Sequence, residues 1–131
     1  MTNSIQKGKD GERELAKVLT ALLGVKCRRG QQHTGLEGED VVGIDGIHIE
    51  CKRDERLNLK KAYEQAQRDA KDDDIPVVCH RKNREPWMIT FALSELVDLV
   101  QVIQDAQQLG ADWYTNEMYR GEKTDIDKDS T

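Results

Sequence analysis

The chain has 131 residues, of which 37% are hydrophobic, enough for one domain with a modest core but not for a protein embedded in a membrane. No apolar run approaches the roughly 20 residues that a membrane-spanning helix needs, and the charged N-terminus is unlike a secretory signal. Three widely spaced cysteines argue against a disulfide framework and favour a reducing, cytoplasmic location.

The formal net charge of −5 is unusual for a protein that binds nucleic acid, but the charge is unevenly distributed. From Glu95 onward the chain carries nine acids and three bases, so the preceding part carries 17 bases against 16 acids. Those bases occur in clusters that could contact phosphates locally. Each cluster is equally compatible with an ordinary solvated surface.

The first predicted element is a helix over residues 9–23. Its leucines recur at helical spacing, and Gly24 is a natural stop. A short strand over residues 25–29 and a polar, glycine-rich loop over residues 30–38 follow.

Residues 40–53 predict a β-hairpin. Two apolar runs flank Asp45-Gly46, a pair typical of a tight turn in which both positions have positive φ. The second run alternates apolar and polar residues with the period of a strand, which places His48, Glu50 and Lys52 on one face.

The rest of the chain alternates helices with strands. The predicted elements are a helix over 57–71, a strand over 75–79, a basic loop over 80–85, a strand over 87–91 and a helix from an N-cap at Ser94 to about 109. We expect residues 1–120 to form a single domain and residues 121–131 to form a disordered acidic tail. This order predicts an α/β fold with a central mixed sheet flanked by helices.

The hairpin carries the candidate site. Glu50 and Lys52 project side by side from one strand, and the antiparallel return of the chain brings Asp40 near Glu50. Two carboxylates beside a lysine suit Mg²⁺, which polarises a phosphate and activates water, while the lysine stabilises charge on the phosphate. The alternative is a surface hairpin with a Glu–Lys pair, because E-x-K alone is common.

The first helix adds Glu12. On a helical wheel Glu12 shares the stripe of the leucines, whereas Glu14 falls on the far side and should face solvent. An acid on a core-facing stripe needs a partner, which would be a metal site or a basic group. Alternatively, Glu12 borders the helix N-terminus, where the helix dipole favours an acid.

The segments KGKDGEREL (Lys7–Leu15), Arg29, Asp40 and ECK (Glu50–Lys52) resemble the PD-(D/E)xK nuclease superfamily, and most closely its archaeal-type and phage Holliday-junction resolvases. The resemblance covers residues 7 to about 93 and implies a restriction-endonuclease-like core. It also implies a DNA endonuclease dependent on Mg²⁺, with Mn²⁺ as a substitute. Resolvases cut two strands symmetrically, so a homodimer acting on branched DNA is expected.

Carried over residue by residue, the resemblance implies an active site of Glu12, Asp40, Glu50 and Lys52, with the three acids as metal ligands. Two features depart from the pattern: Glu39 stands where the superfamily name has proline, and the loop before Asp40 is longer than in the archaeal enzymes.

Residues 62–91 look more like phage-encoded members, whose host cytoplasm would be the site of action, and like VRR-type nuclease domains. Those domains often carry a helix glutamine near the site. Gln65 is the match, Gln67 is the alternative, and a surface glutamine is equally compatible.

Two other functions remain open. One is a nuclease of the same fold that cuts nicked, flapped or duplex DNA. The other is a catalytically idle DNA-binding module, which the intact acid and lysine set disfavours. We expect nine basic side chains to contact DNA: Lys7, Lys9, Arg13, Arg28, Arg29, Arg53, Arg81, Lys82 and Arg84.

The histidines and cysteines do not have the spacing of a zinc site. Cys51 and Cys79 are predicted to be core residues, and so is Trp87. His48 shares a face with Glu50, so it could line the cleft.

Overall fold

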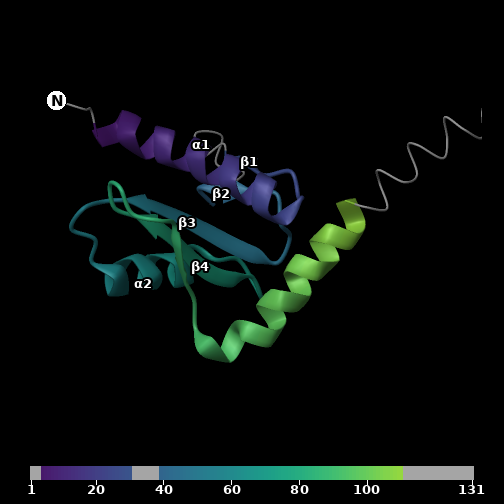
Figure 1. Ribbon diagram of the computed structural model, residues 1–131. Coiled ribbons are helices and arrows are strands. Elements are labelled where there is room, and N and C mark those ends of the chain that lie inside the picture. The colour runs from purple at the N-terminus through teal and green to yellow at the C-terminus, as the bar shows by residue number, and fades with distance from the viewer. Residues whose placement is uncertain (1–3, 31–38, 111–131) are drawn as a thin grey trace, which may run out of the picture.

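The structure, a computed structural model, describes residues 4–30 and 39–110 (Figure 1). Its elements are α1 (Ser4–Leu23), β1 (Arg28–Arg29), β2 (Val41–Val42), β3 (Ile47–Arg53), α2 (Leu59–Asp69), β4 (Ile75–Arg81), β5 (Met88–Thr90) and the 3₁₀ helix η2 (Leu93–Glu95). Residues 96–110 continue from η2 as an α-helix. No helix in these two ranges is long and apolar enough to cross a membrane.

The five strands form one mixed sheet in the order β1-β2-β3-β4-β5. β3 and β4 are parallel, in register from Ile47↔Ile75 to Arg53↔Arg81, and the other neighbours are antiparallel. A parallel pair needs a crossover connection, and α2 provides it. This mixed sheet with flanking helices confirms the predicted α/β fold class.

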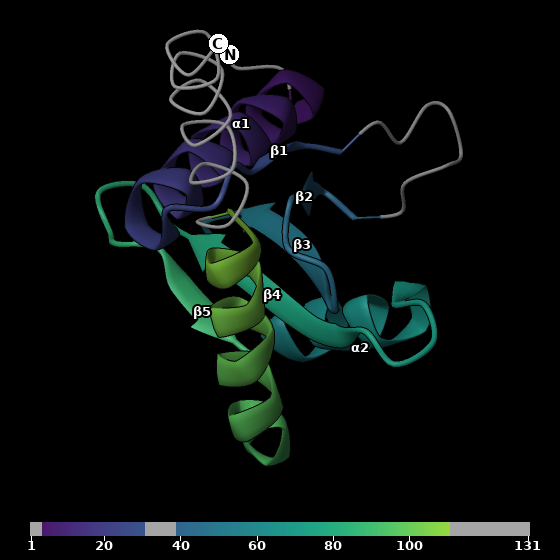
Figure 2. The same ribbon diagram turned by 90° about the vertical axis from the view of Figure 1, so that its right-hand side faces the viewer.

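The sheet is covered on both faces, with α1 on one side and α2 on the other (Figures 1 and 2). The larger core cluster joins Leu15 of α1 to Ile49 of β3 and Leu99 of the last helix. The smaller cluster packs Ala66 of α2 against Val78 of β4. The first four residues of β3, Ile47 to Glu50, are therefore buried on both faces, which is typical of a strand in a parallel pair and explains why His48 and Glu50 lose their water.

The hairpin turn differs from the predicted tight Asp45-Gly46 turn. Positive φ occurs at Gly43 (139°) and Gly46 (97°) but not at Asp45, and four residues link β2 to β3. A Cβ at Gly43 would lie 2.4 Å from the carbonyl oxygen of Lys26. The connection between β2 and β3 is therefore shaped by the close approach of Gly43 to Lys26 as well as by the Asp45-Gly46 pair.

Several element ends also differ from prediction. α1 begins at Ser4, five residues early, and its first turns include a hydrogen bond from the Gln6 side chain to Asp10 (2.9 Å). The first strand is only Arg28–Arg29, because β1 pairs with β2 over two residues. α2 begins after Asn58, whose side chain caps it by accepting from the backbone N–H of Lys61.

The last helix does not start from an N-cap at Ser94. Instead Ser94 lies inside η2, which follows Ala92 without a side-chain cap. The predicted end of α1 is correct: Gly24 has φ 71°, and its N–H donates to the Thr20 carbonyl. Of the predicted loop over residues 30–38 only Gly30 is described, and the predicted tail over residues 121–131 lies outside the described residues.

Candidate active site

Asp40 and Glu50 face each other across the β2–β3 pairing. Val41 pairs with Ile49, and the Asp40 N–H donates to the Ile49 carbonyl at 3.0 Å, so Asp40 stands opposite Glu50. The Asp40 Oδ2 accepts from the Cys51 backbone N–H at 2.8 Å. Both acids are buried, at 8% and 2% exposure.

This acid pair is electrostatically strained. Burial first, and then the charge of Glu50, raise the pKa of Asp40 to about 7, although the hydrogen bond from Cys51 opposes the rise. A side-chain hydrogen bond with Glu50 contributes in the same direction, and such a bond requires one of the two acids to be protonated. A cation between the two oxygens would remove the repulsion, so the donor set fits a hard divalent metal.

Lys52 lies two residues after Glu50 on β3, on the same face of the strand. Its Nζ donates to the side-chain oxygen of Gln65 on α2 at 3.0 Å, and both residues are half-buried. They line a pocket of ≈ 300 Å³ together with Asn58, Lys61 and others, so Lys52 remains reachable from outside. Gln67, the sequence alternative, is exposed.

Glu12 faces the sheet, as its helical position predicts. Its side chain is 14% exposed and accepts from Arg29 Nε at 2.5 Å. The charge of Glu12 also contributes to the raised pKa of Asp40, after larger contributions from burial and Glu50. A basic group is therefore the partner that this acid has in the structure.

The expectation that Glu14 faces solvent is wrong. Its carboxylate pairs with Arg81, accepts from Trp87 Nε1 at 2.9 Å, and is 39% exposed. Both partners lie more than 60 positions away, where the chain leaves β4 and enters β5. A helical wheel cannot include that contact, because the segment that covers the helix is remote in sequence.

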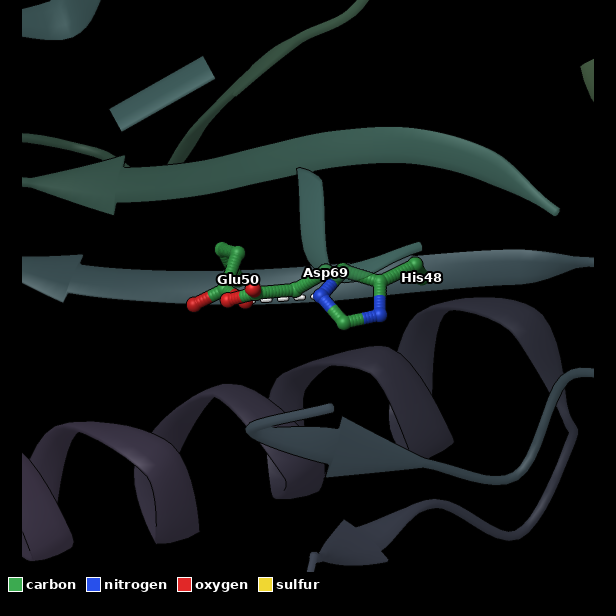
Figure 3. A group of neighbouring side chains, drawn as sticks. All are labelled: His48, Glu50 and Asp69. Carbon is green, nitrogen blue, oxygen red and sulfur yellow. Dashed lines mark hydrogen bonds and ion pairs between the residues drawn. The ribbon is translucent and has the colours of Figure 1, made fainter. Parts of the chain in front are cut away.

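His48 does not line an open cleft. It has no exposed surface, and its Nε2 lies 2.7 Å from Glu50 Oε1 (Figure 3). In the described part of the chain, one set of three potential ligands has atoms within 4.8 Å of one another: His48, Glu50 and Asp69. Glu12, Asp40 and Glu50 do not form so tight a group, and Asp69, which the sequence reasoning missed, is exposed at the end of α2.

Several of the predicted DNA-contacting bases gather near the carboxyl end of β3. The stem of Arg53 packs on Gly11 of α1, where a Cβ would lie 2.4 Å from its Cγ, and Arg53 Nη2 donates to Asn83. Arg81 bridges from β4 to α1. The remaining bases are half-buried or exposed: Lys7, Lys9, Arg13, Arg28, Arg29, Lys82 and Arg84.

The three cysteines are unpaired, and Cys79 is buried while Cys51 and Trp87 pack against the larger core cluster. These placements confirm the prediction that they are packing residues. Burial raises the pKa of the Cys79 thiol to about 12, which keeps it protonated and unreactive.

A helix-flanked mixed sheet that carries D…E-x-K across β2 and β3 defines a nuclease of the PD-(D/E)xK class. The chain belongs to the family of phage putative PDDEXK endonucleases, whose family model matches residues 3–129. Nucleases of this class generally use divalent metals, and the family implies a DNA substrate. No curated protein and no solved structure matches the chain.

Proposed function

We propose that this chain is a Mg²⁺-dependent endodeoxyribonuclease that cuts branched DNA, with four-way junctions as the preferred substrate, and that it acts as a homodimer. The observation that carries the proposal is the buried Asp40–Glu50 pair beside the Lys52–Gln65 contact. Two acids buried in contact are unfavourable for stability unless a cation joins them. A module that only binds DNA needs no such pair.

Asp40 and Glu50 are the residues that would hold the metal, with Glu12 close by. Bound there, a divalent ion supplies Lewis-acid polarisation of the phosphate and activation of water. Lys52 places a positive charge on the same strand face as Glu50, where it stabilises the negative charge that develops on the phosphate. Gln65 holds the Lys52 ammonium in place through its side-chain oxygen.

The preference for branched DNA is supported by the likeness of the α1 motif and of the D…E-x-K hairpin to Holliday-junction resolvases. Bases on α1, β3 and β4 supply contacts to the phosphate backbone, which position DNA without reading sequence. The second candidate is a VRR-type nuclease that acts on nicked, flapped or duplex DNA. The contact between Lys52 and the helix glutamine Gln65 is the observation that favours it.

The test is cleavage of four-way, flapped, nicked and linear DNA of matched sequence, in Mg²⁺, Mn²⁺ or excess EDTA. We expect cutting only with a metal, and fastest cutting of the four-way junction. Asp40→Asn should abolish cutting, whereas Glu64→Gln, on the exposed surface of α2, should leave it unchanged. Full activity in EDTA would refute metal dependence, and faster cutting of flaps or linear duplex would favour the second candidate.

A further inference from the structure

His48 is the second residue of β3 and lies between the sheet and α2, with a side-chain exposure of 1%. On this face of the sheet, Ala66 of α2 and Val78 of β4 belong to an apolar cluster. Burying an imidazole there costs free energy unless its polar atoms are satisfied. The position therefore suggests a role beyond packing.

The satisfied atom is Nε2, which lies 2.7 Å from Glu50 Oε1, a side chain that is itself 3% exposed. A carboxylate that binds a metal is ionised and only accepts hydrogen bonds, so in the metal-binding form of Glu50 it is Nε2 that carries the proton and donates. This bond commits one oxygen of Glu50 to His48 and restricts rotation of the carboxylate. Asp40 stands opposite Glu50 across the β2–β3 pairing, so the orientation of this carboxylate also decides how the two acids face each other.

The second nitrogen, Nδ1, is on the opposite side of the ring from Glu50 (Figure 3). It lies 3.9 Å from Glu39 Oε1, and within the described residues no donor or acceptor is at hydrogen-bond distance from it. The contact with Glu50 is thus the one short polar contact of the ring that the structure shows.

We propose that His48 is a positioning residue that orients the Glu50 carboxylate for metal binding. This inference rests on the proposed function, in which Glu50 is a metal ligand. Hydrogen bonds to ligating carboxylates from such outer groups fix ligand orientation, and their loss typically lowers metal affinity about 10- to 100-fold.

The geometry argues against His48 as a ligand itself. In the 2.7 Å contact Nε2 donates its proton to Glu50 Oε1, so that nitrogen has no lone pair to offer an ion. His48, Glu50 and Asp69 nevertheless lie within 4.8 Å of one another, so Asp69 must be tested separately.

The test uses the full chain and three variants of His48. The amide nitrogen of glutamine can reach the position of Nε2, whereas that of asparagine falls short, and leucine removes the donor altogether. For each variant, the affinity for Mn²⁺ is measured by calorimetry and the affinity for DNA is measured in the presence of EDTA. Cleavage rates give kcat and KM. We expect His48→Gln to remain within a few-fold of wild type, and His48→Asn and His48→Leu to bind Mn²⁺ about 10- to 100-fold more weakly with unchanged DNA affinity.

Unchanged Mn²⁺ affinity in folded His48→Asn or His48→Leu would overturn the inference. Asp69→Asn is the matched control: it should bind Mn²⁺ like wild type, and an equal loss would make His48 part of a metal site with Asp69. If the His48 variants do not fold, imidazole ¹⁵N spectra of the wild type test the inference instead. The Nε2–H signal of His48 should persist when Mg²⁺ is added, and its loss would overturn the inference. Failure of the wild type to bind Mn²⁺ would instead remove the proposed function, and this inference with it.

Discussion

The Lys52 ammonium donates a hydrogen bond to the side-chain oxygen of Gln65 at 3.0 Å, joining the E-x-K strand to α2. The contact spans 13 positions of sequence and orients the lysine that follows Glu50 on the same face of β3. It gives a direct means of separating the charge of Lys52 from its orientation.

Replacing Lys52 by alanine should reduce kcat by about 100- to 1,000-fold, since it removes a preorganised charge that acts on the transition state. The fold should survive, because Lys52 is only half-buried. DNA affinity should fall little, since other bases contact the backbone. Single-turnover cleavage and thermal melting check this, and a Lys52→Ala variant that cuts at nearly the wild-type rate would remove the lysine from the mechanism.

Gln65 and Gln67 form a matched pair on α2. Gln65→Ala should lower kcat about tenfold, because Lys52 loses the group that orients it. Gln67 is exposed, so Gln67→Ala should be silent in the same assay. Equal behaviour of the two variants would mean that the hydrogen bond to Lys52 has no influence on the reaction.

Glu12 and Glu14 should separate activity from stability. Glu12→Gln should lower kcat by at least tenfold, because it removes a negative charge close to Asp40, a proposed metal ligand. Glu14→Gln weakens a partly exposed contact with Arg81 and should cost about 0–1 kcal/mol of stability while leaving kcat unchanged. Urea unfolding and cleavage rates on both variants test this, and loss of activity in Glu14→Gln alone would invert the assignment.

Divalent metal should stabilise the folded protein without DNA. At about 100 times the Kd, binding adds about 2.7 kcal/mol, so Mg²⁺ or Mn²⁺ should raise the Tm of the wild type. Asp40→Asn removes the repulsion with Glu50 and one ligand, so its Tm in EDTA should equal or exceed that of the wild type and should no longer respond to metal. A metal-dependent rise of the same size in Asp40→Asn would show that the ion binds elsewhere.

Two glycines of α1 should respond differently to alanine. Gly8 is exposed and a Cβ there meets nothing within 4 Å, so Gly8→Ala should stabilise the helix by about 0.5–1 kcal/mol. At Gly11 a Cβ would lie 2.4 Å from Arg53 Cγ. Gly11→Ala should therefore displace Arg53, cancel the helical gain and weaken DNA binding. Urea midpoints and DNA affinities of the two variants are the measurement.

The parts of the site that local pattern determines could be predicted from sequence. Strand alternation puts Glu50 and Lys52 on one face, because it follows from a few consecutive residues. The side of α1 that Glu12 occupies follows from helical periodicity for the same reason. The register of the hairpin does not: a two-residue Asp45-Gly46 turn would pair Val41 with Glu50, and Asp40 stands opposite Glu50 only because the connection is wider.

Contacts between distant segments could not be predicted in this way. The partners of Glu14 are 67 and 73 positions away, and no periodicity connects them. The complete burial of His48 depends on α2 packing over a face that alternation alone suggests is polar. The wider turn depends on the close approach of Gly43 to Lys26, which is a tertiary contact.

The burial of Ile47 to Glu50 on both faces of β3 has a kinetic consequence. Backbone amides in central strands exchange with solvent mainly through global unfolding, whereas loops and chain ends open at far lower free energy. The strand that holds Glu50 and Lys52 thus belongs to the slowest-opening part of the molecule. Native-state fluctuations would seldom disturb the part of the backbone that carries Glu50 and Lys52, so the spacing of these two side chains persists for as long as the domain stays folded.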